Sequence, residues 1–377
     1  MNGIAAPWFD KSEYEDRLAR VQVKLADRGL DGLIAFQPET VTWLTGFFTR
    51  GYGTFQCAIV PAEGRPAIVC RDVEEYYLDA TCVFSDRAMW KDGEDPFKTA
   101  ASAAIRHVGG NVRLGVELAS GSLSASGFKK LRESLPAAIW RNESRLAADM
   151  RLIKSPAEIE YQRRAGKVAE AGMQAAIDTA GIGVSEREIA AEICAAMIRA
   201  GSDLPGPGVL SSGERALHLH GGYSDRVLKR GDIVQVETTP NVRHYHARFM
   251  RPIRVAEATE DDRSLVEALI SIQDAALAEV RPGVAACVPD KIYRDGVLSN
   301  NFRDTYTNKT FYSVGLLLPP SGGEPLEAVP GSDWVFESGM TFHTYVLARG
   351  FGMSETIAVT GEGIERLTNF PRRLFVA

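Results

Sequence analysis

The stretch "GDIVQVETTPNVRHYHARFMRPI" at residues 231–253 decides the fold of this chain. Its pattern predicts a buried strand, a turn and a second strand, although charged and imidazole side chains interrupt the apolar positions. Glu237 falls in the first strand and Arg248 in the second. Burying a carboxylate without a partner is strongly unfavourable. The glutamate therefore requires a cation, a metal ion or a reaction that uses it.

Helix signals surround this stretch. Ser155 and Ser185 are good N-caps, and each is followed three residues later by a glutamate, which is typical of a capping box. A third helix is expected at about 260–280, before Pro282 and Gly283. Further strands are expected at 313–318, 340–347 and 355–360. The C-terminal half is therefore predicted to be α+β, with antiparallel strand pairing.

The N-terminal half alternates between helix and strand patterns. At 377 residues the chain is long enough for about two domains. The expected elements are a helix at 14–28, strands at 30–36 and 112–118, a hairpin formed by 57–61 and 66–70, and helices at 97–107 and 124–134. We predict an α/β domain over residues 1–152 and a second domain over 153–377.

Composition and charge restrict the classes of partner. A formal net charge of −6, without a Lys/Arg run longer than a pair, offers no basic surface for nucleic acid or an anionic membrane. No apolar stretch is as long as a membrane span. The five cysteines show no C-x-x-C spacing, and they are expected to be free thiols of a reducing compartment. A cytoplasmic protein is the expectation.

Histidines gather in the second half. A single histidine near these strands would ordinarily be a core residue, but five together favour a polar cavity. A metal site needs three or more well-placed ligands, and the only carboxylates on neighbouring predicted strands are Glu237 and Glu355. The chain therefore has barely enough candidate ligands in this region for a metal site. The five histidines are His218, His220, His244, His246 and His343.

Two motifs indicate a family. The capped helix "KSPAEIEYQRRA" at 154–165 and the strand that begins "GDIV" at 231 resemble the creatinase, prolidase and aminopeptidase P superfamily. The resemblance covers nearly the whole chain and is strongest from Lys154 to Thr360. It implies an α/β N-terminal creatinase-like domain, followed by an α+β catalytic domain with the pita-bread fold.

In the metallopeptidase branch of that superfamily, two aspartates, one histidine and two glutamates hold two metal ions. The resemblance relates those positions to Glu237, Arg248, Tyr312, Tyr345 and Glu355 of this chain. An arginine in place of a bridging carboxylate puts a fixed cation where the ions would bind, and this disfavours them electrostatically. We therefore expect no metal and no other cofactor.

The metal-free branches match more residues. His220 lies eleven residues before Gly231, the position of the proton-transferring histidine in creatinase. The segments 243–246, 312–315 and 339–343 ("RHYH", "YSVG" and "GMTFH") resemble the ectoine hydrolase branch, as does the glutamate at 237. Met250 replaces an acidic residue of creatinase, which argues against creatine as the substrate.

The resemblance implies hydrolysis of a non-peptide C–N bond in a small cyclic amidine, with ectoine opened to N-acetyl-2,4-diaminobutyrate. Glu237 would attack the amidine carbon, His220 would be the general acid/base, and Glu355 would pair with the amidinium. Arg248 would bind the substrate carboxylate, or alternatively form an internal salt bridge to Glu237 or Glu355.

Other candidates for substrate binding lie on the same strands and in one N-terminal loop. In the superfamily this loop, residues 45–55 here, reaches the active site of a partner subunit, which implies a homodimer. Aromatic residues in the loop and the tyrosines of the strands could equally be ordinary core residues. The candidates are Tyr312, Tyr345, His246, His343, Phe48, Arg50 and Tyr52.

Three alternatives stay open. One is a creatinase-like amidinohydrolase. Another is an Xaa-Pro metallopeptidase with a site rebuilt from Glu237, His246, His343 and Glu355. The last is an inactive homologue that binds a small zwitterion without turnover.

Overall fold

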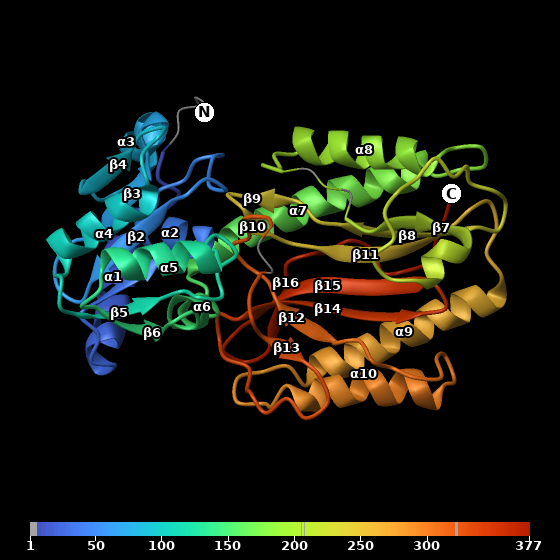
Figure 1. The fold of residues 1–377 in the computed structure, drawn as a ribbon. Helices are drawn as coiled ribbons and strands as arrows, with labels where there is room; N and C mark the ends of the chain where they lie inside the picture. The colour runs from blue at the N-terminus through green and yellow to red at the C-terminus, as the bar shows by residue number, and fades with distance from the viewer. Residues whose placement is uncertain (1–5, 205, 207, 321–322) are drawn as a thin grey trace. The chain divides into compact units, whose positions relative to one another are not determined.

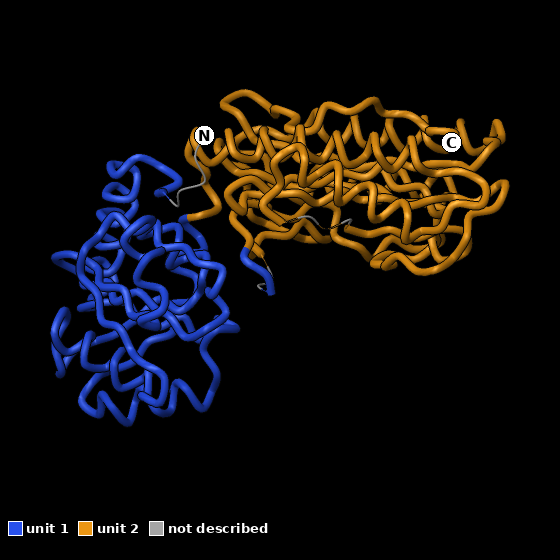
Figure 2. The backbone as a smooth tube through the Cα atoms, turned by 90° about the horizontal axis from the view of Figure 1, so that it is seen from above, with its two compact units in different colours: residues 1–150, 318–322 blue, residues 151–317, 323–377 orange. Residues whose placement is uncertain are grey.

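The computed structural model describes residues 6–204, 206, 208–320 and 323–377. The chain divides into two compact units (Figure 2). Unit 1 contains Met1–Met150 and the short segment Leu318–Gly322, and unit 2 contains Arg151–Leu317 and Gly323–Ala377. The sequence did not predict that a segment from the second half of the chain would belong to the first unit.

Unit 1 is built on a six-stranded sheet with the order β4-β3-β2-β1-β5-β6. The hairpin of β2 and β3 is confirmed, with Cys57 opposite Val69, and β1 pairs in parallel with β5. The strands are β1 (Gly32–Ala35), β2 (Cys57–Pro61), β3 (Ala67–Arg71), β4 (Arg87–Trp90), β5 (Arg113–Val116) and β6 (Ile139–Asn142). The expected α/β organisation is confirmed.

The helices of unit 1 pack around this sheet (Figure 1). Helix α4 begins where the sequence predicts because Asp95 accepts a hydrogen bond from Phe97 N, and its alanines pack into the core beside β2 and β3. The helices are α1 (Lys11–Asp27), α2 (Pro38–Thr45), α3 (Glu75–Thr81), α4 (Pro96–His107), α5 (Ala125–Ser134) and α6 (Leu146–Arg151), with a 3₁₀ turn, η1, at Asp72–Glu74.

Unit 2 begins with the two capped helices. Both capping boxes are present: Ser155 and Glu158 cap α7 (Pro156–Thr179), and Ser185 and Glu188 cap α8 (Glu186–Arg199). These helices pack on the sheet β17-β11-β8-β7. Its strands are β7 (Leu210–Ser212), β8 (Ile233–Thr238), β11 (Phe249–Arg254) and β17 (Phe375–Val376), and the turn η2 (Gly213–Leu217) follows β7.

A second sheet of unit 2 has the order β13-β12-β14-β15-β16. The expected strand at 313–318 is wrong in position, because pairing to β14 covers only Phe311–Ser313. Helix α10 was not predicted. The elements are α9 (Glu260–Ala278), α10 (Cys287–Ser299), β12 (Phe311–Ser313), β13 (Glu327–Ala328), β14 (Thr341–Ala348), β15 (Phe351–Val359) and β16 (Ile364–Arg366), with a small ribbon of β9 (Asn241–Val242) and β10 (Tyr245–His246).

The two sheets of unit 2 lie between two layers of helices (Figure 1). Helices α7 and α8 cover the outer face of the first sheet, and α9 and α10 cover the outer face of the second. Successive side chains of a strand point to opposite faces of its sheet. Each strand therefore offers one set of side chains to a helical layer and the other set to the space between the sheets. No helix in the described ranges is long and apolar enough to cross a membrane.

Candidate functional site

The centre of the candidate site is an ion pair between the two strands that the opening stretch predicts. Arg248 Nε donates a hydrogen bond of 2.8 Å to Glu237 Oε1. The Glu237 side chain is 2% exposed, whereas that of Arg248 is 24% exposed. Glu237 lies directly opposite Met250 in the antiparallel pairing of β8 with β11, and Arg248 directly precedes β11. The cation that the buried carboxylate required is therefore Arg248.

Three aromatic side chains of the second sheet surround this pair. Tyr312 and His343 are directly opposite each other in the pairing of β12 with β14, and Tyr345 is two residues further on the same face of β14. The His343 ring stacks on Tyr345 at 5.4 Å, and the Arg248 guanidinium lies 5.3 Å from the centre of the Tyr312 ring. His343 Nε2 is 3.5 Å from Glu237 Oε1. The structure thus brings together five of the predicted site residues.

His343 is buried, and neither of its ring nitrogens has a hydrogen-bond partner among the residues that the structure describes. Burial, followed by the nearby positive charge of Arg248, holds the pKa of His343 well below its usual value. The imidazole is therefore neutral, and its approach to Glu237 is not an ion pair. A buried polar group without a partner is costly. Such a group in this position is suited to a hydrogen bond with a bound ligand.

The charge states of the neighbours follow from burial and from the ion pair. Although burial alone would lower it, the pKa of Arg248 is raised by the Glu237 carboxylate. Burial raises the pKa of Tyr345 to about 12, and burial also raises that of Tyr312. Both phenols therefore keep their protons at neutral pH. They can donate hydrogen bonds to a ligand beside a charge-balanced Glu237–Arg248 pair.

His246 has a different environment from His343. Its Nδ1 lies 2.8 Å from Gly315 O, and its backbone N–H donates to the same carbonyl. Burial, with a further contribution from Arg248, lowers the pKa of His246 to about 3. The ring is neutral and is fixed to the segment that follows β12. This arrangement fits a structural role, so the expected contact of His246 with substrate stays a prediction.

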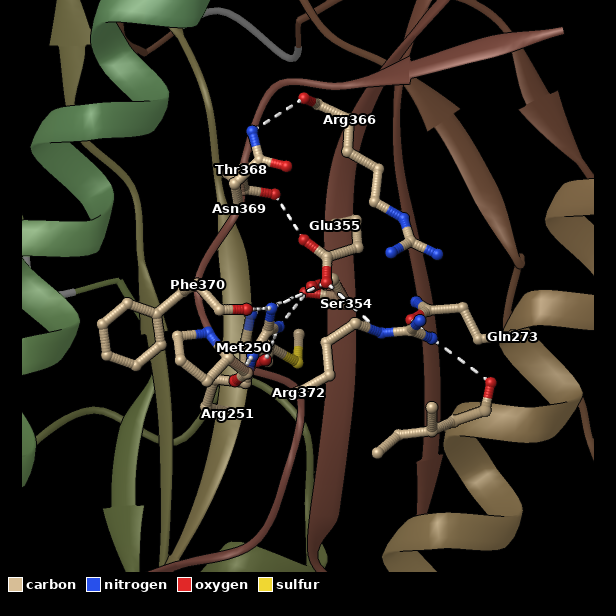
Figure 3. A network of polar contacts seen from close by, with 12 residues as sticks. Met250, Arg251, Gln273, Ser354, Glu355, Arg366, Thr368, Asn369, Phe370 and Arg372 are labelled. Atoms are coloured by element: carbon tan, nitrogen blue, oxygen red, sulfur yellow. Dashed lines mark hydrogen bonds and ion pairs between the residues drawn. The ribbon is translucent and has the colours of Figure 1, made fainter.

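Glu355 does not lie with Glu237. It is directly opposite Thr344 in the pairing of β14 with β15, so it shares the helix-facing side of the sheet and not the side of His343 and Tyr345. Its carboxylate accepts hydrogen bonds from Arg251 (2.7 Å) and Thr368 (Figure 3). The structure therefore does not support the expectation that Glu355 pairs with a substrate amidinium, because its oxygens already have these partners.

His220 is also separate from the ion pair. It is exposed in the turn after η2 and has a positive φ of 64°. The carbonyl of Gly221 accepts a hydrogen bond from Leu210 N, so this turn lies beside β7, which separates it from β8. No hydrogen bond or ion pair joins His220 to Glu237 within the described ranges. The general acid/base role of His220 stays a prediction.

The N-terminal loop belongs to unit 1. Arg50 is exposed, and the Phe48 and Tyr52 rings are 6.1 Å apart. Tyr52 Oη donates a hydrogen bond of 2.9 Å to Pro319 O, within the short segment that unit 1 contains. Glu39 accepts a hydrogen bond from Leu318 N in the same segment. The contribution of this loop to the site of a partner subunit stays a prediction.

Thr356, which joins the two sheets at the site, was not predicted from the sequence. Thr356 Oγ1 accepts a hydrogen bond from Arg248 N and donates one to Arg248 O, both at 2.8 Å. Thr356 shares the inward face of β15 with Ser354, whose hydroxyl accepts a hydrogen bond from Met250 N. A threonine in a strand is common, and only the register between the sheets identifies its role.

The metal-ligand positions implied by the resemblance do not form a donor set. The Glu237 carboxylate is paired with Arg248, and Glu355 faces the other side of its sheet. Tyr312 and Tyr345 keep their protons, which makes them poor ligands. No group of three or more His, Cys, Asp or Glu residues in the described part of the chain could hold a metal ion. The residues do not fit a dinuclear metal centre.

Comparisons with known proteins agree with this architecture. Residues 160–363 match the model of metallopeptidase family M24, and residues 17–153 match the creatinase/prolidase N-terminal domain. The chain is 27% identical over 394 residues to "Ectoine hydrolase" of Halomonas elongata, with 98% of each chain covered. It is 28% identical over 380 residues to "Probable dipeptidase PepE" of Mycobacterium tuberculosis, again with 98% of each covered.

A solved structure gives the same answer. Dipeptidase PepE from Mycobacterium ulcerans superposes with a TM-score of 0.84 at 25% identity, covering 98% of this chain and 99% of the other. The two sheets, their helical layers and the N-terminal α/β unit are therefore the creatinase and pita-bread architecture. The chain belongs to the hydrolase family M24, with a creatinase/prolidase N-terminal domain.

Proposed function

We propose that this protein is a metal-independent hydrolase of a non-peptide C–N bond in a small cyclic amidine that carries a carboxylate, with ectoine as the named substrate. The observation that carries the proposal is the pair of Glu237 and Arg248, which the resemblance relates to metal-ligand positions. The pair faces the imidazole of His343, which has no hydrogen-bond partner among the described residues. A zwitterionic substrate carries a positive charge that can bind Glu237 and a negative charge that can bind Arg248.

The reaction follows from the residues of the pair. One oxygen of Glu237 forms a bond to the amidine carbon, and the ring C–N bond then breaks. The departing nitrogen keeps the electron pair and takes a proton from a general acid. Water adds to the resulting acyl imidate and releases Glu237, and the proton lost by this water restores the acid. One water is consumed, and the single ring-opened product carries both an amide and an amine.

The supporting residues have separate roles. Glu237 Oε1 is bound by Arg248, and no hydrogen bond to Oε2 is seen among the described residues. His343 and the phenols of Tyr312 and Tyr345 offer neutral hydrogen bonds to the ring nitrogens. His343 Nε2 is 3.5 Å from Glu237 Oε1. As Glu237 attacks, the neutral imidazole of His343 can accept a proton from the substrate amidinium and so become the general acid for the departing nitrogen, and we assign proton transfer to His343 first. His220 is the alternative.

The peptidase reading remains the main competitor because the relatives include "Probable dipeptidase PepE" at a similar identity. Its weakness is the donor set, in which an arginine pairs with the first carboxylate. The test is to incubate chelator-treated protein with ectoine, related cyclic amidines and Xaa-Pro dipeptides, and to follow products by mass spectrometry. Ring opening without metal supports the proposal. Dipeptide cleavage that requires added manganese or zinc overturns it.

We further propose a homodimer in which the loop at 45–55 contributes to a neighbouring site. Support comes from the resemblance to the family. The exposed Arg50 of this loop would offer a second cation for a substrate carboxylate. Analytical ultracentrifugation tests the oligomeric state. A monomer that retains full activity contradicts this part of the proposal without affecting the chemistry assigned to Glu237.

A further inference from the structure

We propose that the substrate carboxylate binds the free end of Arg248 and thereby activates Glu237, so that the carboxylate raises the rate of the chemical step as well as the affinity. This inference rests on the function proposed above. Arg248 would thus recognise the carboxylate that defines the substrate class and would also control the reactivity of the nucleophile Glu237.

The bonding of Arg248 is the first observation. A guanidinium has five N–H donors, and Arg248 uses Nε for Glu237. Among the described residues, no hydrogen bond or ion pair to either terminal nitrogen is seen. The side chain is 24% exposed, so these nitrogens can reach a ligand while Nε still contacts Glu237. Two parallel N–H donors match the geometry of a carboxylate.

The rigidity of Arg248 is the second observation. Its backbone N–H and C=O are both bound to Thr356 Oγ1, and its guanidinium lies over the Tyr312 ring. These contacts anchor the backbone of Arg248 and favour a guanidinium position beside Glu237. A carboxylate at the outer end of the guanidinium would share the same positive charge with Glu237.

The consequence for Glu237 is electrostatic. In the resting protein Arg248 draws electron density toward Oε1 and stabilises the free carboxylate, which makes it a weaker nucleophile. The substrate carboxylate weakens the attraction between Arg248 and Glu237, and its own negative charge repels that of Glu237. Attack on the amidine carbon removes the negative charge of Glu237, so the bound substrate favours the step in which that charge is lost.

The proposal separates two kinds of carboxylate contact. A carboxylate that only anchors the ligand stabilises the ground state and the transition state equally, so its loss raises KM and leaves kcat unchanged. A carboxylate that activates Glu237 acts on the chemical step. Its loss therefore lowers kcat, and a separate small carboxylate that binds the same guanidinium restores part of the rate.

The experiment compares ectoine with its decarboxylated analogue, 2-methyl-1,4,5,6-tetrahydropyrimidine, in the presence and absence of sodium formate. We expect kcat for the analogue to fall by about tenfold to a hundredfold, and formate to raise it severalfold in a saturable manner. Sodium chloride at equal ionic strength is the control. An unchanged kcat, or formate without effect on the analogue, overturns the inference.

A second readout does not need turnover. In wild-type protein labelled with ¹³C at glutamate carboxyls, the Glu237 signal is assigned by its loss in Glu237→Gln, and formate is titrated in. We expect a saturable shift of that signal, absent in Arg248→Met. If ectoine is not opened but formate shifts the signal, the proposed function fails and the coupling stands. If the wild-type signal does not shift, the coupling fails whatever the fate of ectoine.

Discussion

Arg248 directly precedes β11 and Arg251 lies within it. Each is paired with a buried glutamate, but the two differ in how many of their N–H donors are bound within the protein. Arg251 donates five hydrogen bonds, one to Glu355 and the others to the carbonyls of Met250, Ser354, Phe370 and Pro371 (Figure 3). Its side chain is fully buried. Within the described part of the chain, Arg248 makes one side-chain hydrogen bond, and it is partly exposed.

The difference shows how to distinguish a structural ion pair from one that serves a ligand. All donors of Arg251 are satisfied within the protein, so the Arg251–Glu355 pair holds β11, β15 and the C-terminal segment together. The Glu237–Arg248 pair leaves donors unused beside an unpaired imidazole. Buried polar groups are normally satisfied, and the exceptions call for an explanation. Here the explanation is a ligand.

The largest expected effect concerns Glu237. Glu237→Gln keeps the shape of the side chain and its acceptor for Arg248 but removes the nucleophilic carboxylate. We expect the ring-opening rate to fall by roughly a thousandfold or more, measured by mass spectrometry on protein with unchanged circular dichroism. The matched control is Glu355→Gln, assayed under conditions where it is fully folded. An equal loss of rate in both variants would contradict the distinction between the two pairs.

The next effect concerns stability. Arg251→Met leaves Glu355 buried without its principal partner, and we expect the free energy of unfolding of unit 2 to fall by about 3–5 kcal/mol. Arg248→Met removes a partly exposed partner that has fewer bonds, so its cost should be smaller. Urea denaturation followed by fluorescence compares the two. If Arg248→Met proves the more destabilising, then Arg248 is primarily structural.

The histidines extend the same comparison. His343→Asn removes the imidazole that faces Glu237, and we expect kcat to fall by about tenfold to a hundredfold. His220→Asn changes an exposed side chain and should leave kcat within about threefold. Steady-state kinetics on ectoine checks both variants. The reverse order of effects would return the general acid/base role to His220.

A smaller effect is expected in the pH dependence of stability. The pKa of His246 is about 3 in the folded protein and about 6.5 when the chain is unfolded. The unfolded state binds more protons below about pH 6.5, so this contribution is fully present above that pH and is lost as the pH falls toward 3. We expect His246→Asn to reduce the slope of the unfolding free energy by about 1.4 kcal/mol per pH unit.

Urea titrations at pH 6, 5 and 4 measure this slope in wild type and variant. Cys57→Ala, in unit 1, is a suitable control because its substitution should leave the slope unchanged. A variant with the slope of wild type would show that His246 is protonated in the folded protein.

The sequence predicted the family, the architecture and both capping boxes, because these depend on local patterns and on a few motifs. It also selected Glu237, Arg248, Tyr312, His343 and Tyr345, which the structure brings together. It did not reveal which face of its strand Glu355 occupies, for a physical reason. Strands β14 and β15 are buried on both faces, so their apolar residues do not reveal which side chains point inward.

Register alone resolves that ambiguity, because a shift of one residue reverses the face of every side chain. Thr344 is opposite Glu355 and Tyr345 is opposite Ser354. The role of Thr356 depends on the same register. Helix α10 was missed because its signal is weak: it has no side-chain cap, and Pro289 and Gly296 lie within it.

The short segment Leu318–Gly322 has a consequence for how this protein can be cut and recombined. The chain leaves unit 2 after Leu317 and returns at Gly323, between Gly315, which binds His246, and Glu324, which pairs with Lys154. A fragment that begins at 153 would carry this segment without Glu39 and Tyr52, to which it is bonded. Modular exchange of the N-terminal unit between homologues would therefore require co-transfer of those five residues.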